Sequence, residues 1–111
     1  MKLTYLASPY SHESPSVRHH RFEAAVNTAA MLMSCGILVY SPIAHTHAMS
    51  VAHDLPTDWK FWEQHCRAFL AASERMVILK LDGWDRSIGI RAETEIAIEM
   101  GIPIAIMEYK R

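Results

Sequence analysis

Short apolar runs alternate with helical patterns along this chain, and that order limits the possible fold more than any other feature. The runs are bounded by Ser, Pro, Asp or Gly, as buried strands usually are. The strand candidates are residues 3–7, 37–40, 76–81 and 104–107. The helix candidates are residues 16–34, 59–73 and 88–100. Strands separated by helices form parallel sheets with right-handed crossovers. We therefore predict one α/β domain over residues 1–111, a three-layer sandwich of flavodoxin or Rossmann type with a mostly parallel sheet of four or five strands.

The expected ends of the helices rest on residues with known capping roles. Gly36 closes the first helix, and Gly101 closes the last one before Pro103. Thr57 or Asp58 is the expected cap of the helix at 59–73. Between the second strand and this cap, we expect a polar stretch without a helix.

Composition excludes several classes of protein. Half of the 111 residues are hydrophobic and the formal net charge is -1, so neither a nucleic acid nor an anionic membrane is an expected partner. The apolar start is interrupted by Ser8 and Pro9, too soon for a secretory signal, and no run approaches the ~20 residues of a membrane span. Cys35 and Cys66 have no disulfide-type spacing. We therefore expect a cytoplasmic protein with reduced thiols.

Polar residues gather where the predicted strands end. Ligands of such sheets bind beyond the carboxyl ends of the strands. The residues at this edge are Ser8, Pro9, Tyr10, Ser41, His45, Asp82 and the segment 87–93. Ser87 and Gly89 suit a helix N-terminus, whose free N–H groups can bind a phosphate. Glu93 follows about one turn later and is expected to face the same crevice. An anion cradle beside a carboxylate predicts a site for a sugar phosphate.

The same residues carry a resemblance to a known family. The first strand reads Tyr-Leu-Ala-Ser-Pro-Tyr over residues 5–10, and Asp82-Gly83 precedes a Ser-x-Gly-x-x-x-Glu pattern over residues 87–93. These patterns resemble the nucleoside 2-deoxyribosyltransferase superfamily, and the Ser-Pro-Ile-Ala-His segment at 41–45 resembles its small DUF1937 type. The serine spacing also resembles the 2'-deoxynucleoside 5'-phosphate N-hydrolases of that superfamily, in which the serine helps to hold the 5'-phosphate.

The resemblance implies roles for individual residues. Glu93 would attack the anomeric carbon of the sugar, and Tyr5 would orient it. Ser8, Pro9, Tyr10, His45, Ser87 and Gly89 would line the substrate site. Where relatives carry an aspartate that contacts the base or sugar, this chain has Cys66. A thiol does not replace a carboxylic acid in that role. Asp82 and His45 are the candidates for the missing acid, and the sequence leaves this choice open.

Each of these residues also has a purely structural interpretation. Glu93 would then be a solvated helix carboxylate, Ser87 an N-cap, Asp82 part of a turn and Tyr5 a packing residue. Arg18 and Arg21 lie near the same edge, but a solvated face is the expected place for both. The spacing of His45, His47 and His53 fits no zinc signature, so no metal and no cofactor are expected.

Two functions from different classes follow. The first is an enzyme that cleaves or transfers the N-glycosidic bond of a nucleoside or its 5'-monophosphate. The alternative is a non-catalytic nucleotide-binding or sensing module of the same fold. Trp59, Phe61 and Trp62 are too many large aromatics for one buried helix face, so one side is expected to contact a second subunit. We therefore predict a homodimer or a higher homo-oligomer.

Overall fold

The computed structural model describes residues 3–56 and 58–109 and confirms an α/β fold with one parallel sheet. The strands are β1 (Leu3–Ala7), β2 (Val39–Tyr40), β3 (Ser73–Lys80) and β4 (Ile104–Glu108). The helices are α1 (Pro15–Ser34), α2 (Pro42–His53), α3 (Trp59–Ala71) and α4 (Ile88–Glu99), with a short 3-10 turn at Trp84–Arg86. Thr57, one of the two expected caps of α3, lies outside the described residues. Asp58 occupies the cap position without a side-chain hydrogen bond to the helix.

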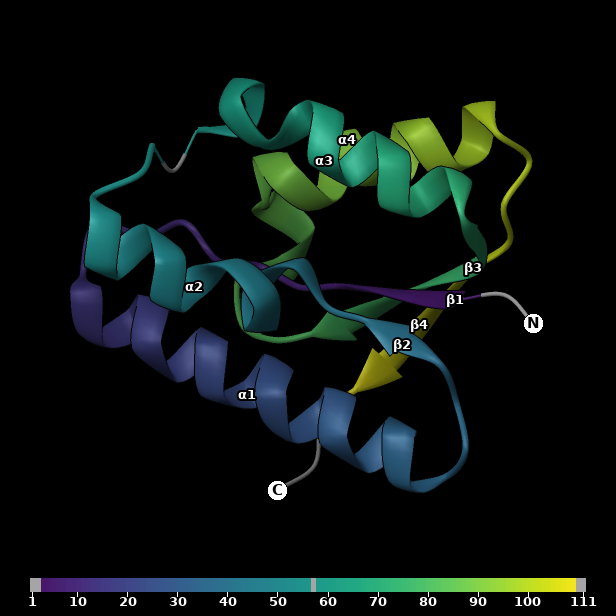
Figure 1. Ribbon diagram of the computed structural model, residues 1–111, viewed down its shortest axis with the longest axis horizontal. Coiled ribbons are helices and arrows are strands. Elements are labelled where there is room, and N and C mark those ends of the chain that lie inside the picture. The colour runs from purple at the N-terminus through teal and green to yellow at the C-terminus, as the bar shows by residue number, and fades with distance from the viewer. Residues whose placement is uncertain (1–2, 57, 110–111) are drawn as a thin grey trace.

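The order of the strands fixes where a ligand site is expected. The sheet runs β2-β1-β3-β4, and β1 pairs in parallel with both β2 and β3 (Figure 1). The chain therefore leaves β1 in one direction to reach β2 and crosses to the other side to reach β3. The crevice at such a reversal, outside the carboxyl ends of the strands, is the usual binding position in doubly wound sheets. Here that crevice lies beyond β1 and β3.

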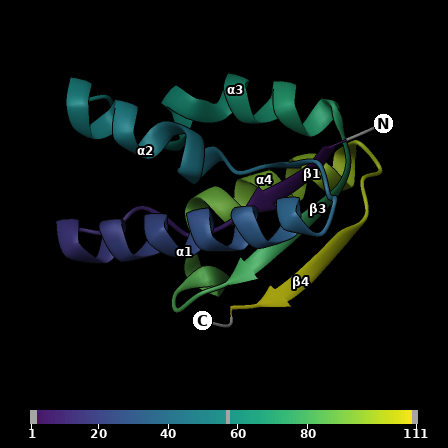
Figure 2. The same cartoon turned by 60° about the horizontal axis from the view of Figure 1, so that its bottom comes forward.

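Helices cover both faces of the sheet because residues of each strand point alternately to the two sides. Tyr5 and Met76 belong to a core cluster with residues of α3 and α4, whereas Leu6 and Leu79 belong to a second cluster with residues of α1. Figure 2 shows the same arrangement from a second side, with α2 next to α1. The predicted three-layer architecture is thus confirmed.

Helix α2 is the main difference from the expected structure. The sequence pattern predicts a polar stretch without a helix after the second strand, and this prediction is wrong, because Pro42–His53 form a helix. Ser41 caps it, because its side-chain oxygen accepts a hydrogen bond from the backbone N–H of Ala44 at 3.1 Å, and Pro42 suits its first turn. Asp54 ends the helix with a left-handed backbone (φ 50°). Only two residues remain in β2, which is shorter than predicted.

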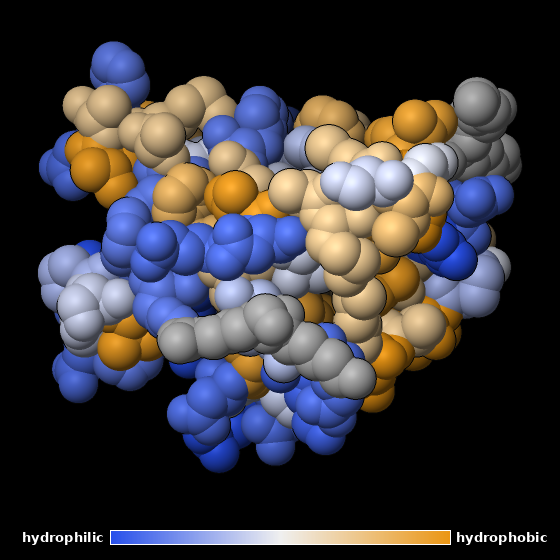
Figure 3. All heavy atoms as spheres, turned by 90° about the horizontal axis from the view of Figure 1, so that it is seen from below, coloured by the Kyte–Doolittle hydropathy of each residue, from blue (hydrophilic) through white to orange (hydrophobic). Residues whose placement is uncertain are grey.

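Large apolar side chains are exposed on several elements, including α1 and β4. The exposed fractions of Met31, Met33 and Ile106 are 45%, 58% and 56%. In the view from below, hydrophilic atoms mostly gather toward the end where α1 begins and hydrophobic atoms toward the opposite end (Figure 3). The predicted homo-oligomer remains a prediction. No helix in the described part of the chain is long and apolar enough to cross a membrane.

Candidate active site

A hydrogen bond between Tyr5 and Glu93 joins the first strand to the last helix. The Tyr5 hydroxyl donates to Oε2 of Glu93, which lies in the second turn of α4. Neither side chain is open to solvent: the exposed fractions are 0% for Tyr5 and 5% for Glu93. The interpretation of Glu93 as a solvated helix carboxylate is therefore wrong. A carboxylate is seldom buried to this extent without a charged partner, so its burial calls for a functional explanation.

The environment of Glu93 changes its protonation. Burial raises the pKa of Glu93 from the usual 4.5 to about 7, and the hydrogen bond from Tyr5 acts in the opposite direction. Burial and the neighbouring Glu93 raise the pKa of Tyr5 well above its ordinary range. The Tyr5 hydroxyl thus remains a proton donor while Glu93 changes charge near neutral pH. A carboxyl group with such a pKa can act either as an acid or as an ionised nucleophile.

Tyr40 and Cys66 lie next to this pair. Tyr5 and Tyr40 are directly opposite each other in the β1–β2 pairing, and their ring centroids are 5.9 Å apart. Cys66 projects from α3 into the same core cluster as Tyr5, with an exposed fraction of 7%. Burial, with a smaller effect of Glu93, raises the pKa of the Cys66 thiol to about 12. Cys66 is therefore a neutral free thiol at physiological pH, as expected for a reduced cysteine.

His45 is connected to the same cluster through Tyr40. The Tyr40 hydroxyl and Nδ1 of His45 are 3.2 Å apart, within hydrogen-bond distance. The Tyr40 ring stacks on Phe69 of α3, with centroids 3.8 Å apart and planes 4° from parallel. His45 itself is exposed. The structure therefore connects three of the candidate residues, Tyr5, His45 and Glu93. Tyr40 makes the connection, because its ring neighbours Tyr5 and its hydroxyl contacts His45.

The loop after β1 carries the next candidates. Ser8 and Pro9 are buried, and Oγ of Ser8 has no hydrogen-bond partner among the described residues. Burying a hydroxyl without a hydrogen-bond partner costs about 1–3 kcal/mol of folding free energy. A ligand that formed a hydrogen bond with this oxygen would offset that cost. Tyr10 is half-buried and its hydroxyl lies 2.6 Å from Nδ1 of His47, whose ring stacks on Phe22. Tyr10 thus belongs to a contact between α1 and α2.

The described contacts of Asp82 are with Arg21 and not with the Tyr5–Glu93 pair. The backbone oxygen of Asp82 accepts a hydrogen bond from Nη2 of Arg21 at 3.0 Å, and Nη1 of the same guanidinium donates to the backbone oxygen of Ser11 at 2.9 Å. Arg21 is half-buried and ties together the loops that follow β1 and β3. The fit is close, since a methyl group on Gly83 would lie 2.8 Å from Nη2. A solvated face was the wrong expectation for Arg21, which places a positive charge at the predicted edge.

Ser87 and Gly89 form the start of α4. Ser87 caps the helix, because its Oγ accepts a hydrogen bond from the backbone N–H of Ile90 at 3.2 Å. A Cβ on Gly89 would meet Oγ of Ser87 only at 3.8 Å, an ordinary contact. Capping and anion binding use different groups of a helix N-terminus, so the observed cap is compatible with the predicted phosphate contact.

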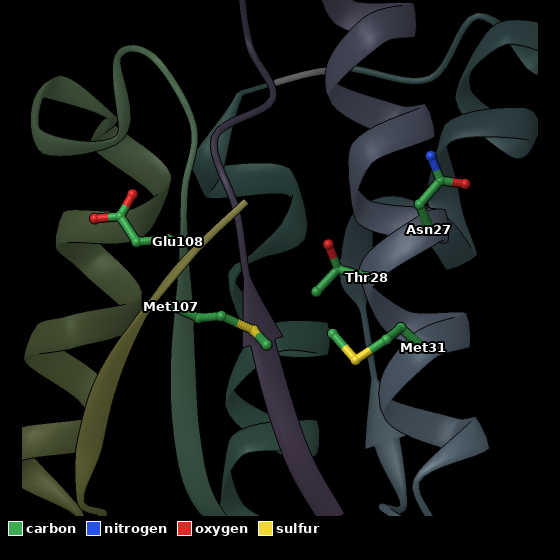
Figure 4. Close-up of a pocket in the computed structure, with 5 residues that line it drawn as sticks. All are labelled: Asn27, Thr28, Met31, Met107 and Glu108. Atoms are coloured by element: carbon green, nitrogen blue, oxygen red, sulfur yellow. The ribbon is translucent and has the colours of Figure 1, made fainter. Parts of the chain in front are cut away.

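The two hollows described for the surface lie elsewhere. One, of about 390 Å³, lies between α1 and β4 and is lined by Asn27, Thr28, Met31, Met107 and Glu108 (Figure 4). The other, of about 250 Å³, lies between α3 and α4. Neither hollow is lined by Tyr5 or Glu93. We place the candidate site at this pair because it holds a buried carboxyl group with a raised pKa. Within residues 3–56 and 58–109, no three His, Cys, Asp or Glu side chains are arranged to hold a metal ion.

Comparison with known proteins places the chain in a family. A family described as a domain of unknown function, DUF1937, matches residues 2–109. The chain belongs to the DUF1937 family. A comparison with curated proteins finds no match. For this DUF1937 domain, kinship with the deoxyribosyltransferase superfamily therefore remains a prediction.

Sequence reasoning missed two residues of the candidate site. Tyr40 was treated only as the end of a strand, although its position opposite Tyr5 follows once the register of the two strands is known. Arg21 was assigned to solvent because nothing in the sequence reveals that its guanidinium reaches two loop carbonyls. The burial of Glu93 did leave a signal, because Ile90, Ile96 and Ala97 share its helix face.

Proposed function

We propose that this chain cleaves the N-glycosidic bond of a nucleoside 5'-monophosphate or nucleoside, with water or a second base as the acceptor. The buried hydrogen bond between Tyr5 and Glu93 is the observation that carries this proposal. Cleavage of this bond passes through a transition state with positive charge on the sugar. A carboxylate beneath the anomeric carbon can stabilise that charge or form a covalent intermediate.

The roles of Tyr5 and Glu93 follow from their protonation. Glu93 attacks as the ionised carboxylate, and its pKa of about 7 leaves a large share of the groups ionised at neutral pH. Burial makes the carboxylate more reactive because little water surrounds it. Tyr5 keeps its proton and holds one carboxylate oxygen, Oε2, so the other oxygen is directed to the sugar.

Three features at the strand edge favour a phosphorylated substrate. Arg21 supplies a positive charge between the loops after β1 and β3. The N-terminus of α4, capped by Ser87, offers free backbone N–H groups. Oγ of Ser8 lacks a partner among the described residues and can donate a hydrogen bond to a ligand oxygen. A phosphate in this region would also fix the sugar relative to Glu93.

Burial of Glu93 has a consequence for substrate entry. Only 5% of Glu93 is exposed, so a sugar can reach its carboxylate only if the covering side chains move. Substrate binding in the proposed enzyme is therefore coupled to an opening of the structure around the pair.

The test is incubation of the protein with a panel of nucleosides and nucleoside 5'-monophosphates, followed by chromatography of the released bases. We expect release from at least one 5'-monophosphate, and a sugar phosphate as the second product when water is the acceptor. Binding of a nucleotide without release, seen as a raised melting temperature, would contradict the enzyme and favour the non-catalytic module. Cys66, in the position of an aspartate in the resembled superfamily, is the observation that favours that second function.

A further inference from the structure

We propose that His45 is the acid that protonates the departing base, and that Tyr40 is the residue that positions it. This inference rests on the proposed function, since it assigns the second half of the same reaction. A nucleobase leaves far more readily as a neutral molecule than as an anion, so bond cleavage requires a proton donor on the side of the base.

His45 is held in a defined position by its own helix. It lies in the first turn of α2, where its backbone N–H donates to the carbonyl oxygen of Ser41 at 3.0 Å. The hydroxyl of Tyr40 binds Nδ1 of the imidazole, and the Tyr40 ring is in turn fixed by its stacking on Phe69. In the imidazolium form, which is the acid, both ring nitrogens carry a proton, so Nδ1–H donates to the Tyr40 oxygen and the Nε2 proton is available to a ligand. Within residues 3–56 and 58–109, Nε2 has no assigned partner.

The two proposed functional groups lie on either side of a tyrosine pair. Glu93 binds the hydroxyl of Tyr5, and His45 binds the hydroxyl of Tyr40, while the two rings are neighbours on β1 and β2. His45 is exposed whereas Glu93 is buried. A substrate that places its sugar over Glu93 can thus direct its base toward the solvent side, where His45 is available.

The other candidate acids fit less well. The described contact of Asp82 joins its backbone oxygen to Arg21, and no described interaction connects its side chain to Tyr5, Tyr40 or Glu93. Cys66 is close to Glu93, but a thiol with a pKa of about 12 gives up its proton poorly near neutral pH. Histidine is the side chain suited to donate and accept a proton between pH 5 and 8.

The proposed step balances in protons and electrons. The bond between the anomeric carbon and the base nitrogen breaks, and its electron pair passes to the base. The imidazolium of His45 gives its Nε2 proton to the base, while a carboxylate oxygen of Glu93 forms a bond to the anomeric carbon. Water then attacks that carbon and releases Glu93, and His45 takes up the proton of the water. The net reaction consumes one water and yields the base and the free sugar phosphate.

The test uses two leaving groups that differ in their need for a proton. One substrate is the nucleoside 5'-monophosphate with the fastest base release, and the other is the 4-nitrophenyl glycoside of the same sugar phosphate. At pH 8 nitrophenolate departs without protonation. The variants are His45→Gln and Tyr40→Phe, with His53→Gln at the exposed C-terminal end of α2 as the matched control.

We expect His45→Gln to lower kcat/KM for the nucleotide at least ~100-fold and for the nitrophenyl compound less than ~5-fold. Tyr40→Phe keeps the stacked ring and should show a smaller loss with the same selectivity, which a purely structural defect would not produce. His53→Gln should match the wild type. Equal losses on both substrates, or no loss in His45→Gln, would overturn the role of His45. Absence of release by the wild type from any compound would instead overturn the proposed function itself.

Discussion

Replacing Glu93 with glutamine is expected to lower the rate of base release by at least about 1,000-fold, which corresponds to about 4 kcal/mol of transition-state stabilisation. Glutamine has almost the same shape as glutamate and can still accept the hydrogen bond from Tyr5, so the fold should persist. It carries no charge to stabilise the sugar cation and forms no stable bond to the anomeric carbon. The loss should therefore fall on kcat for every substrate, the nitrophenyl compound included.

Glu95→Gln is the matched control for this variant. Glu95 lies two residues further along α4, is exposed, and pairs with Arg91 at 3.7 Å. The same chemical change at Glu95 should leave base release within about two-fold of the wild type, because exposed ion pairs contribute little. Base release by Glu93→Gln at a tenth or more of the wild-type rate would contradict a nucleophilic role for Glu93.

The same Glu93→Gln substitution should stabilise the folded protein at alkaline pH. The carboxyl has a pKa of 4.5 when unfolded and about 7 when folded. Below pH 4.5 both states hold the proton and ionisation costs nothing. Between these values the unfolded state has lost the proton that the folded state keeps, so the free energy of unfolding falls as pH rises. Above pH 7 the full cost of a buried charge remains, about 3 kcal/mol at about 1.4 kcal/mol per pKa unit.

Urea unfolding at pH 5 and pH 8 measures this effect. We expect Glu93→Gln to exceed the wild type in free energy of unfolding by about 3 kcal/mol at pH 8 and by less than about 1 kcal/mol at pH 5. Glu95→Gln, the same change at an exposed position of α4, is again the matched control. If Glu93→Gln were less stable than the wild type at pH 8, the carboxylate would contribute to stability, and the functional explanation of its burial would be wrong. Higher stability together with loss of activity is the expected pattern when a catalytic charge is buried at a cost in stability.

The layers of this fold could be predicted from the sequence because each strand is a short apolar run with clear boundaries. Helix α2 could not be predicted in the same way. Its residues include three histidines and few large apolar groups, and only Pro42 and Ser50 are buried, so hydrophobic periodicity gives little signal there. Its start is set by the local cap at Ser41, a residue that the sequence pattern indicates as the end of a strand and as part of the ligand edge, but not as a helix cap.

The candidate site was predictable in part. The resemblance assigned Glu93 and Tyr5 to one site although they are 88 residues apart, and the structure describes a hydrogen bond between them. The contacts of Asp82 and Arg21 were not predictable, because they depend on how the loops after β1 and β3 meet at the edge of the sheet. The contact of His45 with Tyr40 depends on helix α2, which was not predicted. The choice between His45 and Asp82 as the acid, open in the sequence, rests on the observed hydrogen bond to Tyr40.

A covalent sugar phosphate on Glu93 would test the central claim most directly. A 4-nitrophenyl glycoside of the sugar phosphate with fluorine at C2' should form the intermediate and release it slowly, because fluorine destabilises the positive charge and the good leaving group favours the first step. Mass spectrometry of the tryptic peptide that spans residues 92–110 then locates the added mass. We predict one sugar phosphate on Glu93 and none in Glu93→Gln. An adduct on a different side chain, or release of nitrophenolate by the wild type without any adduct on Glu93, would contradict the account.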